Sequence, residues 1–149
     1  MAHTRINFLS VPVDIIPEQN LANEITEISQ NMTSSQICFV TIWDILKARI
    51  NQDYMNCLKN SELVIPISKS ILSGANFLKL AVPTRYNPFK AVISIMNALD
   101  KNYRSLYMLG GRRDSLMAAE KNVRATFSGL RIVGRYVGYY PKTSEADLV

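Results

Sequence analysis

The sequence predicts an α/β fold: a three-layer, Rossmann-like domain with a mostly parallel sheet. Short apolar runs alternate with helical patterns along the whole chain, as in folds whose helices cover both faces of a sheet. Residues 37–42 form a continuous apolar run, which is typical of a parallel strand buried on both faces. With 149 residues, 48% of them hydrophobic, the chain is long enough for one core, so we predict a single domain over residues 1–149.

The first half of the chain carries alternating strand and helix signals. Pro17 opens a pattern in which Leu21, Ile25 and Ile28 share one face, and this predicts an amphipathic helix. The other expected elements are a strand or small hairpin over residues 6–13, a strand over 37–42, a helix capped by Asp44 and a short helix over 53–58.

The second half of the chain repeats this alternation. The expected elements are a strand over residues 63–66, a helix over 69–80, a loop over 81–89, a helix from Lys90, a strand over 106–109, a helix over 114–127 and a strand over 130–133. After Tyr140 the segment SEADLV begins like a helix whose following strand does not arrive. We therefore expect a shortened version of a longer domain.

Composition narrows the classes of function. Two cysteines, Cys38 and Cys57, make neither a disulfide framework nor a metal site, and they fit a reducing cytoplasm. No apolar run approaches the roughly 20 residues of a membrane-spanning helix. His3 is the only histidine, which argues against a histidine-based catalytic triad or metal site. We expect a cytoplasmic protein.

Positive charge is concentrated in the last third of the chain. Residues 101–149 carry nine Lys/Arg against four Asp/Glu, whereas the first 100 residues carry eight of each. A face with this excess attracts the phosphates of a nucleotide, an anionic lipid surface or nucleic acid. The alternative is an ordinary solvated surface.

A glycine turn between a strand and a helix is the strongest candidate for ligand binding. Gly110 and Gly111 allow close backbone approach, and Arg112 and Arg113 add charge suited to phosphate. The free N–H groups of the following helix would face the same crevice. The alternative is a simple tight turn, since the G-x-G-x-x-G pattern is absent.

Other candidates each have a structural alternative. Thr41 ends a buried strand, where doubly wound sheets bind ligands, and Arg85 lies in a loop from which it can grip a phosphate. Tyr139, among neighbouring tyrosines, offers a stacking surface for a base or sugar. The candidate acids or bases, for which helix caps or surface positions are the favoured interpretation, are Asp14, Asp44, Glu62 and Asp114.

The order of motifs resembles the WecG/TagA/CpsF family of bacterial glycosyltransferases over residues 6–140. The matching segments are FLSVPVD, FVTIWDILKAR, SELVIP, MLGGRRDSLMAAEKNV and GLRIVGRYVGYY. The resemblance implies metal-independent, inverting transfer of an N-acetylmannosamine-type sugar from a UDP donor to a polyprenyl-diphosphate-linked acceptor, without a cofactor. A carboxylate base would deprotonate the acceptor hydroxyl while positive groups stabilise the leaving diphosphate.

Individual residues match that pattern unevenly. Thr41 corresponds to the family's active-site threonine, but Trp43 stands where an asparagine is usual. The position of the proposed base, an aspartate in the family's Pro-Asp-Gly, is Ile67 in this chain. Arg85 corresponds to a loop arginine whose following glycine and acid are missing, whereas the Gly110-Gly111 turn is intact.

Three hypotheses follow. The first is a working transferase in which Asp44 or Glu62 substitutes for the base. The second is a catalytically degenerate relative that binds nucleotide sugars or assists assembly. The third is a structural subunit that forms homo-oligomers or binds a protein partner. The first implies contact with the inner face of the membrane that holds the acceptor, and none of the three involves nucleic acid.

Overall fold

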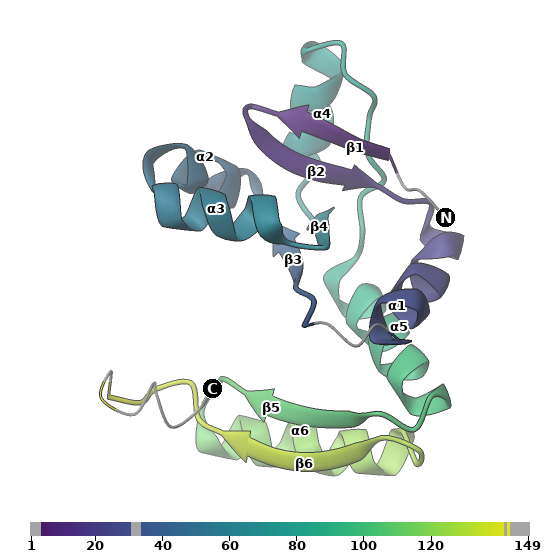
Figure 1. Cartoon of the computed structure of the whole chain (residues 1–149). Coiled ribbons are helices and arrows are strands. Elements are labelled where there is room, and N and C mark those ends of the chain that lie inside the picture. The colour runs from purple at the N-terminus through teal and green to yellow at the C-terminus, as the bar shows by residue number, and fades with distance from the viewer. Residues whose placement is uncertain (1–3, 31–33, 142, 144–149) are drawn as a thin grey trace. The chain divides into compact units, whose positions relative to one another are not determined.

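The computed structural model describes residues 4–30, 34–141 and 143. The chain divides into two compact units, Met1–Ile95 (unit 1) and Met96–Val149 (unit 2) (Figure 1). His3 lies outside the described residues. Organisation as one domain stays a prediction.

Unit 1 combines a hairpin, two parallel strands and several helices. Its elements are β1 (Thr4–Phe8), β2 (Val11–Ile15), a 3-10 helix (Glu18–Asn20), α1 (Leu21–Gln30), β3 (Ile37–Val40), α2 (Ile42–Ile50), α3 (Gln52–Asn60), β4 (Leu63–Pro66) and α4 (Lys69–Phe77). The helix α5 (Pro88–Lys101) begins in unit 1 and continues past its last residue.

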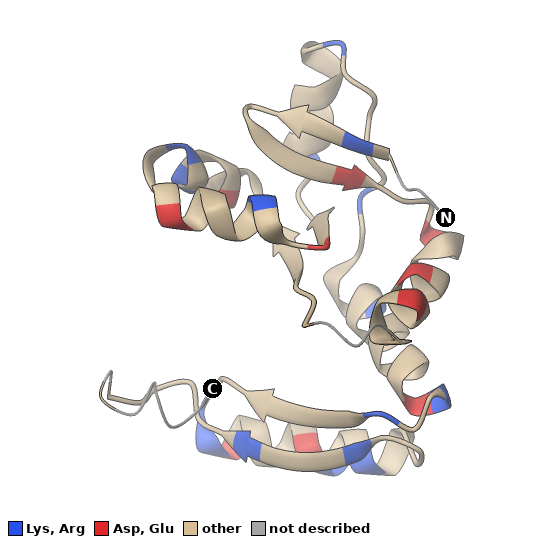
Figure 2. Cartoon of the chain, in the orientation of Figure 1, with Lys and Arg blue, Asp and Glu red and all other residues tan. Residues whose placement is uncertain are grey.

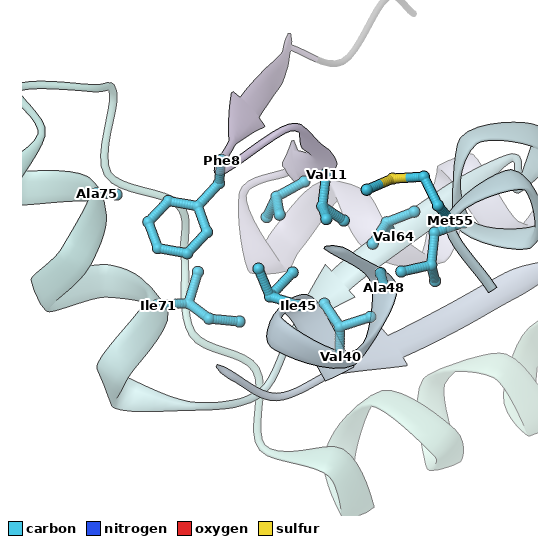
Figure 3. Packing of buried hydrophobic residues seen from close by; sticks show 11 residues of the cluster. Phe8, Val11, Val40, Ile45, Ala48, Met55, Val64, Ile71 and Ala75 are labelled. Atoms are coloured by element: carbon cyan, nitrogen blue, oxygen red, sulfur yellow. The ribbon is translucent and has the colours of Figure 1, made fainter. Parts of the chain in front are cut away.

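The core of unit 1 gathers apolar side chains from the hairpin, the parallel strands and α2 to α4 (Figure 3). Phe8, from the end of β1, lies against Ile71 and Ala75 of α4 in this view. All four residues of β4 are buried, as expected for a strand covered on both faces. Each fully buried aliphatic or aromatic side chain stabilises the fold by about 2 kcal/mol, which makes this cluster the main stabilising element of unit 1.

The hairpin and its attachment to β4 follow from two local features. Leu9 and Ser10 link β1 to β2 with positive φ angles of 52° and 72°, the backbone of a tight two-residue hairpin loop. Asp14 of β2 is buried and accepts a hydrogen bond from the Val64 N–H at 2.6 Å. Arg5 of β1 donates to the same carboxylate from Nε at 2.7 Å and from Nη2 at 2.9 Å. These bonds neutralise the buried charge and join the hairpin to β4.

Unit 2 contains the strand-turn-helix-strand segment that the sequence indicates. Two parallel strands, β5 (Ser105–Leu109) and β6 (Arg131–Tyr136), flank the helix α6 (Arg113–Thr126) in the chain. The ladder has an irregularity: Leu106 pairs with Ile132, but Tyr107 pairs with Gly134. A Cβ on Gly134 would lie 2.6 Å from the Tyr107 ring, so glycine allows this close crossing.

The parallel pairs β3–β4 and β5–β6 confirm an α/β fold, and the first predicted segment forms the hairpin. Among the described residues the strands form three two-stranded sheets, so the three-layer, Rossmann-like arrangement stays a prediction. Several predicted boundaries were wrong. The strand predicted over 37–42 ends at Val40, and Thr41 is the N-cap of the next helix in place of Asp44. The helix predicted over 69–80 ends at Phe77, and α5 begins at Pro88, inside the predicted loop.

Candidate functional site

The carboxyl ends of β3 and β4 bring Thr41 and Ile67 to one edge of unit 1. The two strands pair in parallel up to Val40 and Pro66, and the Ile67 N–H donates to the Val40 carbonyl at 3.0 Å. Thr41 and Ile67 are therefore the residues that follow the last paired positions of adjacent strands. Both are half-buried. This is the edge at which open α/β sheets bind their ligands.

Asp44 lies at this edge but is held by its neighbours. It closes a capping box over Thr41, whose N–H and hydroxyl both donate to Oδ2, at 2.8 and 2.6 Å. The Tyr54 hydroxyl donates to Oδ1 at 3.2 Å. Partial burial alone raises the pKa of Asp44, but the bonds from Thr41 and Tyr54, with Lys47 nearby, bring it below its ordinary value. The carboxylate thus stays ionised and is a weak base.

Tyr54 belongs to the same cluster and stays protonated. Burial, followed by the charge and hydrogen bond of Asp44, raises the pKa of Tyr54 to about 12. The Lys47 ammonium lies 5.4 Å from the centre of the Tyr54 ring. Tyr54 therefore acts as a donor that keeps α3 in contact with the first turn of α2.

Trp43 occupies the first turn of α2, immediately before Asp44. Its side chain is 75% exposed, whereas Ile45 on the same helix is fully buried. The capping box fixes the backbone of this turn, so the indole projects from a rigid position beside Thr41. An exposed indole on an ordered helix is a suitable surface for an apolar or aromatic ligand.

The loop that carries Arg85 is attached to the same edge. Arg85 Nε donates to the Ile67 carbonyl at 3.3 Å, and the Tyr86 N–H donates to the Pro66 carbonyl at 3.2 Å. The buried Tyr86 hydroxyl donates to the Ile16 carbonyl. Burial raises the pKa of Tyr86 to about 12, so this donor persists at neutral pH. Thr41, Ile67 and Arg85 are thereby gathered in one place.

Glu62 lies at the opposite end of β4. It precedes Leu63, the first residue of that strand, and its N–H donates to the Gln36 carbonyl at 2.9 Å. The Glu62 carbonyl accepts a bond from Arg5 Nη2 at 2.7 Å. A strand of four residues is about 13 Å long, which separates Glu62 from the edge that holds Thr41 and Ile67.

The glycine turn of unit 2 follows β5. Gly110 has φ +131° and Gly111 has φ +69°, and a Cβ at either position would meet nothing within 4 Å. Glycine is required there by the backbone conformation and not by crowding. The Gly110 N–H donates to the Tyr136 carbonyl at 3.1 Å, and the Gly138 N–H donates to the Gly111 carbonyl at 3.0 Å.

Gly138 makes that second contact possible. A Cβ on Gly138 would lie 3.0 Å from both Gly110 Cα and Gly111 N, which are backbone atoms that cannot move independently. The turn is therefore built from three glycines, of which two supply the conformation and one supplies the space.

Basic side chains surround this turn. Arg112 is the N-cap of α6 and Arg113 is its first residue, and both are exposed. Arginine has no acceptor with which to cap the first N–H groups of the helix, so these groups suit an anion. Figure 2 shows that basic residues occur on both α6 and β6. A neighbouring pocket of about 350 Å³ is lined by Arg113, Leu116, Met117, Arg135, Tyr136 and Val137.

Part of this charge is neutralised within unit 2. Glu120, on α6, forms ion pairs with Arg124 at 2.9 Å and with Arg135. Tyr136 contacts Tyr140 edge to face with ring centres 6.0 Å apart, and Tyr139 is 79% exposed. The arginines at the start of α6 are thus better placed than Arg135 to meet an added anion.

Comparison with known families gives a match for the chain. The model of the glycosyl transferase WecG/TagA/CpsF family matches residues 6–149. The chain belongs to this family. No curated protein matches it. The members of this family are glycosyltransferases, which suggests a nucleotide-sugar donor and an acceptor as substrates.

Two features relevant to membrane and metal chemistry can be stated for the described residues. No helix among them is long and apolar enough to cross a bilayer. Within the same residues, no three His, Cys, Asp or Glu side chains gather as they would around a metal ion.

Two functional features were missed from the sequence. The Asp44 and Tyr54 contact joins two helices, and only the Thr-x-x-Asp spacing of a capping box at Thr41 pointed to half of it. The spacing role of Gly138 was also missed, although its position four residues after Gly134 was visible.

Proposed function

We propose that this family member binds a UDP-activated N-acetylmannosamine-type sugar and a polyprenyl-diphosphate-linked acceptor, but lacks the carboxylate base that transfer requires. The observation that carries the proposal is Ile67. It follows the last residue of β4, bonds to the end of β3 through its N–H and accepts from Arg85 through its carbonyl, at the position where the family pattern has its aspartate. An aliphatic side chain cannot accept the proton of an acceptor hydroxyl.

Neither candidate substitute fits the task well. Asp44 is at the correct edge, but three hydrogen bonds occupy its oxygens and its pKa is lowered, which weakens it as a base. Glu62 immediately precedes β4 and so lies at the other end of the strand from Ile67. The geometry therefore favours ligand binding over efficient transfer.

Retained donor binding is supported by the glycine turn. Gly110 and Gly111 keep the positive φ angles of the turn, and Arg112 and Arg113 stand at the start of a 14-residue helix whose first N–H groups have no side-chain cap from Arg112. A diphosphate carries charge that these groups can neutralise. This argument concerns unit 2 alone and does not depend on the base.

Binding is tested by titrating the full chain with UDP in a calorimeter and by thermal shift. We expect Arg113→Glu to weaken UDP binding by roughly tenfold or more, because it reverses a charge at the turn. The matched control is Arg131→Glu, which makes the same charge change at the first residue of β6, whereas the glycine turn contacts Tyr136 at the last residue of that strand. If both variants lose the same affinity for UDP, the loss reflects the change in net charge and not a site at the turn. If the unmodified chain does not respond to millimolar UDP, donor binding is rejected.

The missing base is tested by restoring it. We expect Ile67→Asp to release UDP from a UDP-sugar at a rate roughly 100-fold above that of the unmodified chain, with or without acceptor. The asparagine of the control variant Ile67→Asn has nearly the same shape as aspartate but cannot act as a base. This variant should therefore release UDP at the background rate. If both variants are equally inactive while UDP still binds, more than the base has been lost.

Asp44 supports one competing function, an active transferase with a substitute base. Its Oδ2 lies 2.6 Å from the hydroxyl of Thr41, and its lowered pKa keeps it ionised at neutral pH. In that case the unmodified chain transfers sugar and Asp44→Asn abolishes transfer while UDP binding persists. No transfer by the unmodified chain removes this alternative.

A further inference from the structure

The two cysteines of the chain lie together inside unit 1 although they are 19 positions apart. Cys38 is the second residue of β3, and Cys57 is on α3. Both thiols are half-buried. The cluster is distinct from the edge that holds Thr41, because Cys38 lies earlier in the same strand.

A shared set of polar groups joins the two thiols. Cys38 Sγ lies 3.2 Å from the Ser61 hydroxyl, within hydrogen-bonding distance. Cys57 Sγ donates to Gln36 Oε1 at 3.6 Å, and the Ser61 hydroxyl reaches that same oxygen at 3.4 Å. Ser61 also donates to the Cys57 carbonyl at 2.8 Å. The two thiols therefore lie in one cluster, linked through the polar groups of Ser61 and Gln36.

The electrostatics of Cys38 agree with this placement. Burial raises the pKa of Cys38, a bond with Ser61 offsets part of that rise, and the adjacent Cys57 thiol raises it again. Cys38 is therefore held as a neutral thiol, which disfavours it as the first group to be oxidised. Its role as the second thiol rests on position, because Ser61 contacts both cysteines and Gln36 contacts Ser61 and Cys57, and its thiol must lose its proton to attack an oxidised Cys57 sulfur.

We propose that Cys38 and Cys57 are a redox modification site that forms an intramolecular disulfide when the protein meets a peroxide. Hydrogen peroxide first oxidises Cys57 to a sulfenic acid, and its O–O bond breaks with release of one water. Cys38 Sγ then attacks the Cys57 sulfur and displaces the hydroxyl as a second water. Two thiols and one peroxide thus give one disulfide and two waters, and an external dithiol reverses the change.

The disulfide would close the segment that carries Thr41 and Trp43 into a covalent ring. Residues 38–57 contain all of α2, the first part of α3 and the capping box of Thr41 and Asp44. A covalent link between β3 and α3 restricts the unfolded chain and limits separation of α3 from the strand. Oxidation therefore acts on the scaffold that orients Thr41 and Trp43, without touching either residue.

The site is tested on the full chain with hydrogen peroxide, followed by alkylation and mass spectrometry without reductant. We expect an oxidised chain that takes up no alkyl group and weighs about 2 Da less than the unalkylated reduced chain, a single cross-linked peptide pair containing Cys38 and Cys57, and reversal by dithiothreitol. The oxidised chain should melt several degrees higher than the reduced chain. Cys57→Ser and Cys38→Ser should each lose the cross-link and the shift.

Adjacency is tested separately with phenylarsine oxide, which bridges two neighbouring thiols without requiring a sulfur–sulfur bond. We expect one arsenical per chain in the unmodified protein and none retained after washing in Cys57→Ser. Retention of the arsenical without disulfide formation would overturn the proposal, as would oxidation of the two cysteines to separate sulfinic acids. Disulfide-linked dimers in place of the internal bond would overturn it equally.

Discussion

The strand ends of the two units differ in what they keep from the family pattern. In unit 1 the backbone positions at the carboxyl ends of β3 and β4 are formed, but Trp43 and Ile67 stand where the family resemblance implies polar side chains. In unit 2 the Gly110-Gly111 turn is complete. Binding by backbone N–H groups depends on conformation, whereas proton transfer depends on one carboxylate. A single substitution at the position of the base can therefore remove catalysis and leave the fold and the glycine turn intact.

The two units also differ in how they are stabilised. Unit 1 has a cluster of fully buried side chains and a buried, fully bonded aspartate. Among the described residues of unit 2, the buried apolar side chains come from α5, α6, β6 and the connection between α6 and β6, and they keep 4–8% exposure. A change at the buried aspartate of unit 1 should therefore cost more than a change at the turn of unit 2.

The largest effect is expected from Asp14→Asn. The amide group places a donor where the carboxylate accepts from Arg5 and from the Val64 N–H, and it leaves the Arg5 charge without its partner. We expect a loss of about 3 kcal/mol in the free energy of unfolding. Denaturant titration measures the loss, and hydrogen exchange should locate it in peptides from β2 and β4.

The matched control for Asp14 is an exposed ion pair in unit 2. Arg124→Gln removes the pair with Glu120, which retains Arg135, and should change stability by less than about 0.5 kcal/mol. Similar losses in the two variants would contradict the contrast between the units.

A smaller effect is expected at the turn itself. Gly138→Ala places a methyl group 3.0 Å from Gly110 Cα and Gly111 N, so the turn must open. We expect a loss of about 2 kcal/mol in stability together with weaker UDP binding. The control is Gly134→Ala, whose methyl group meets the Tyr107 side chain, which is 48% exposed and can swing aside. Equal losses of stability in Gly138→Ala and Gly134→Ala would contradict the role of backbone crowding at the turn.

The sequence predicted the elements better than their contacts. Apolar periodicity is local, so the strands at 63–66 and 106–109 and the helix over 114–127 were found to within one or two residues. Asp44 was placed on the correct helix but given the role of N-cap, because its spacing from Thr41 was not used. The sequence did not predict two contacts, Asp44 with Tyr54 and Arg85 with Ile67. Each contact forms because the chain turns back on itself, and no short sequence pattern indicates this.

The smallest effect is expected from Asp44→Asn. It decides whether the Asp44 carboxylate, at the edge that holds Thr41 and Ile67, has a structural role. Its folded pKa is lowered, so deprotonation favours the folded state. The contribution is complete above the unfolded pKa of about 3.9 and is lost as the pH falls through the lower folded value. Asp44→Asn should therefore cost about 1 kcal/mol at pH 7, the typical loss for a helix cap, and progressively less as the pH falls through the folded pKa of Asp44.

Asp53→Asn is the matched control, because Asp53 lies in the first turn of α3 and is exposed. It removes the same charge near a helix start without a capping box, so its cost should stay below about 0.5 kcal/mol at every pH. Urea titrations of both variants between pH 2.5 and 7 measure the difference. A cost for Asp44→Asn that does not change with pH would contradict the capping role, and the carboxylate would again be a candidate for the base that Ile67 does not provide.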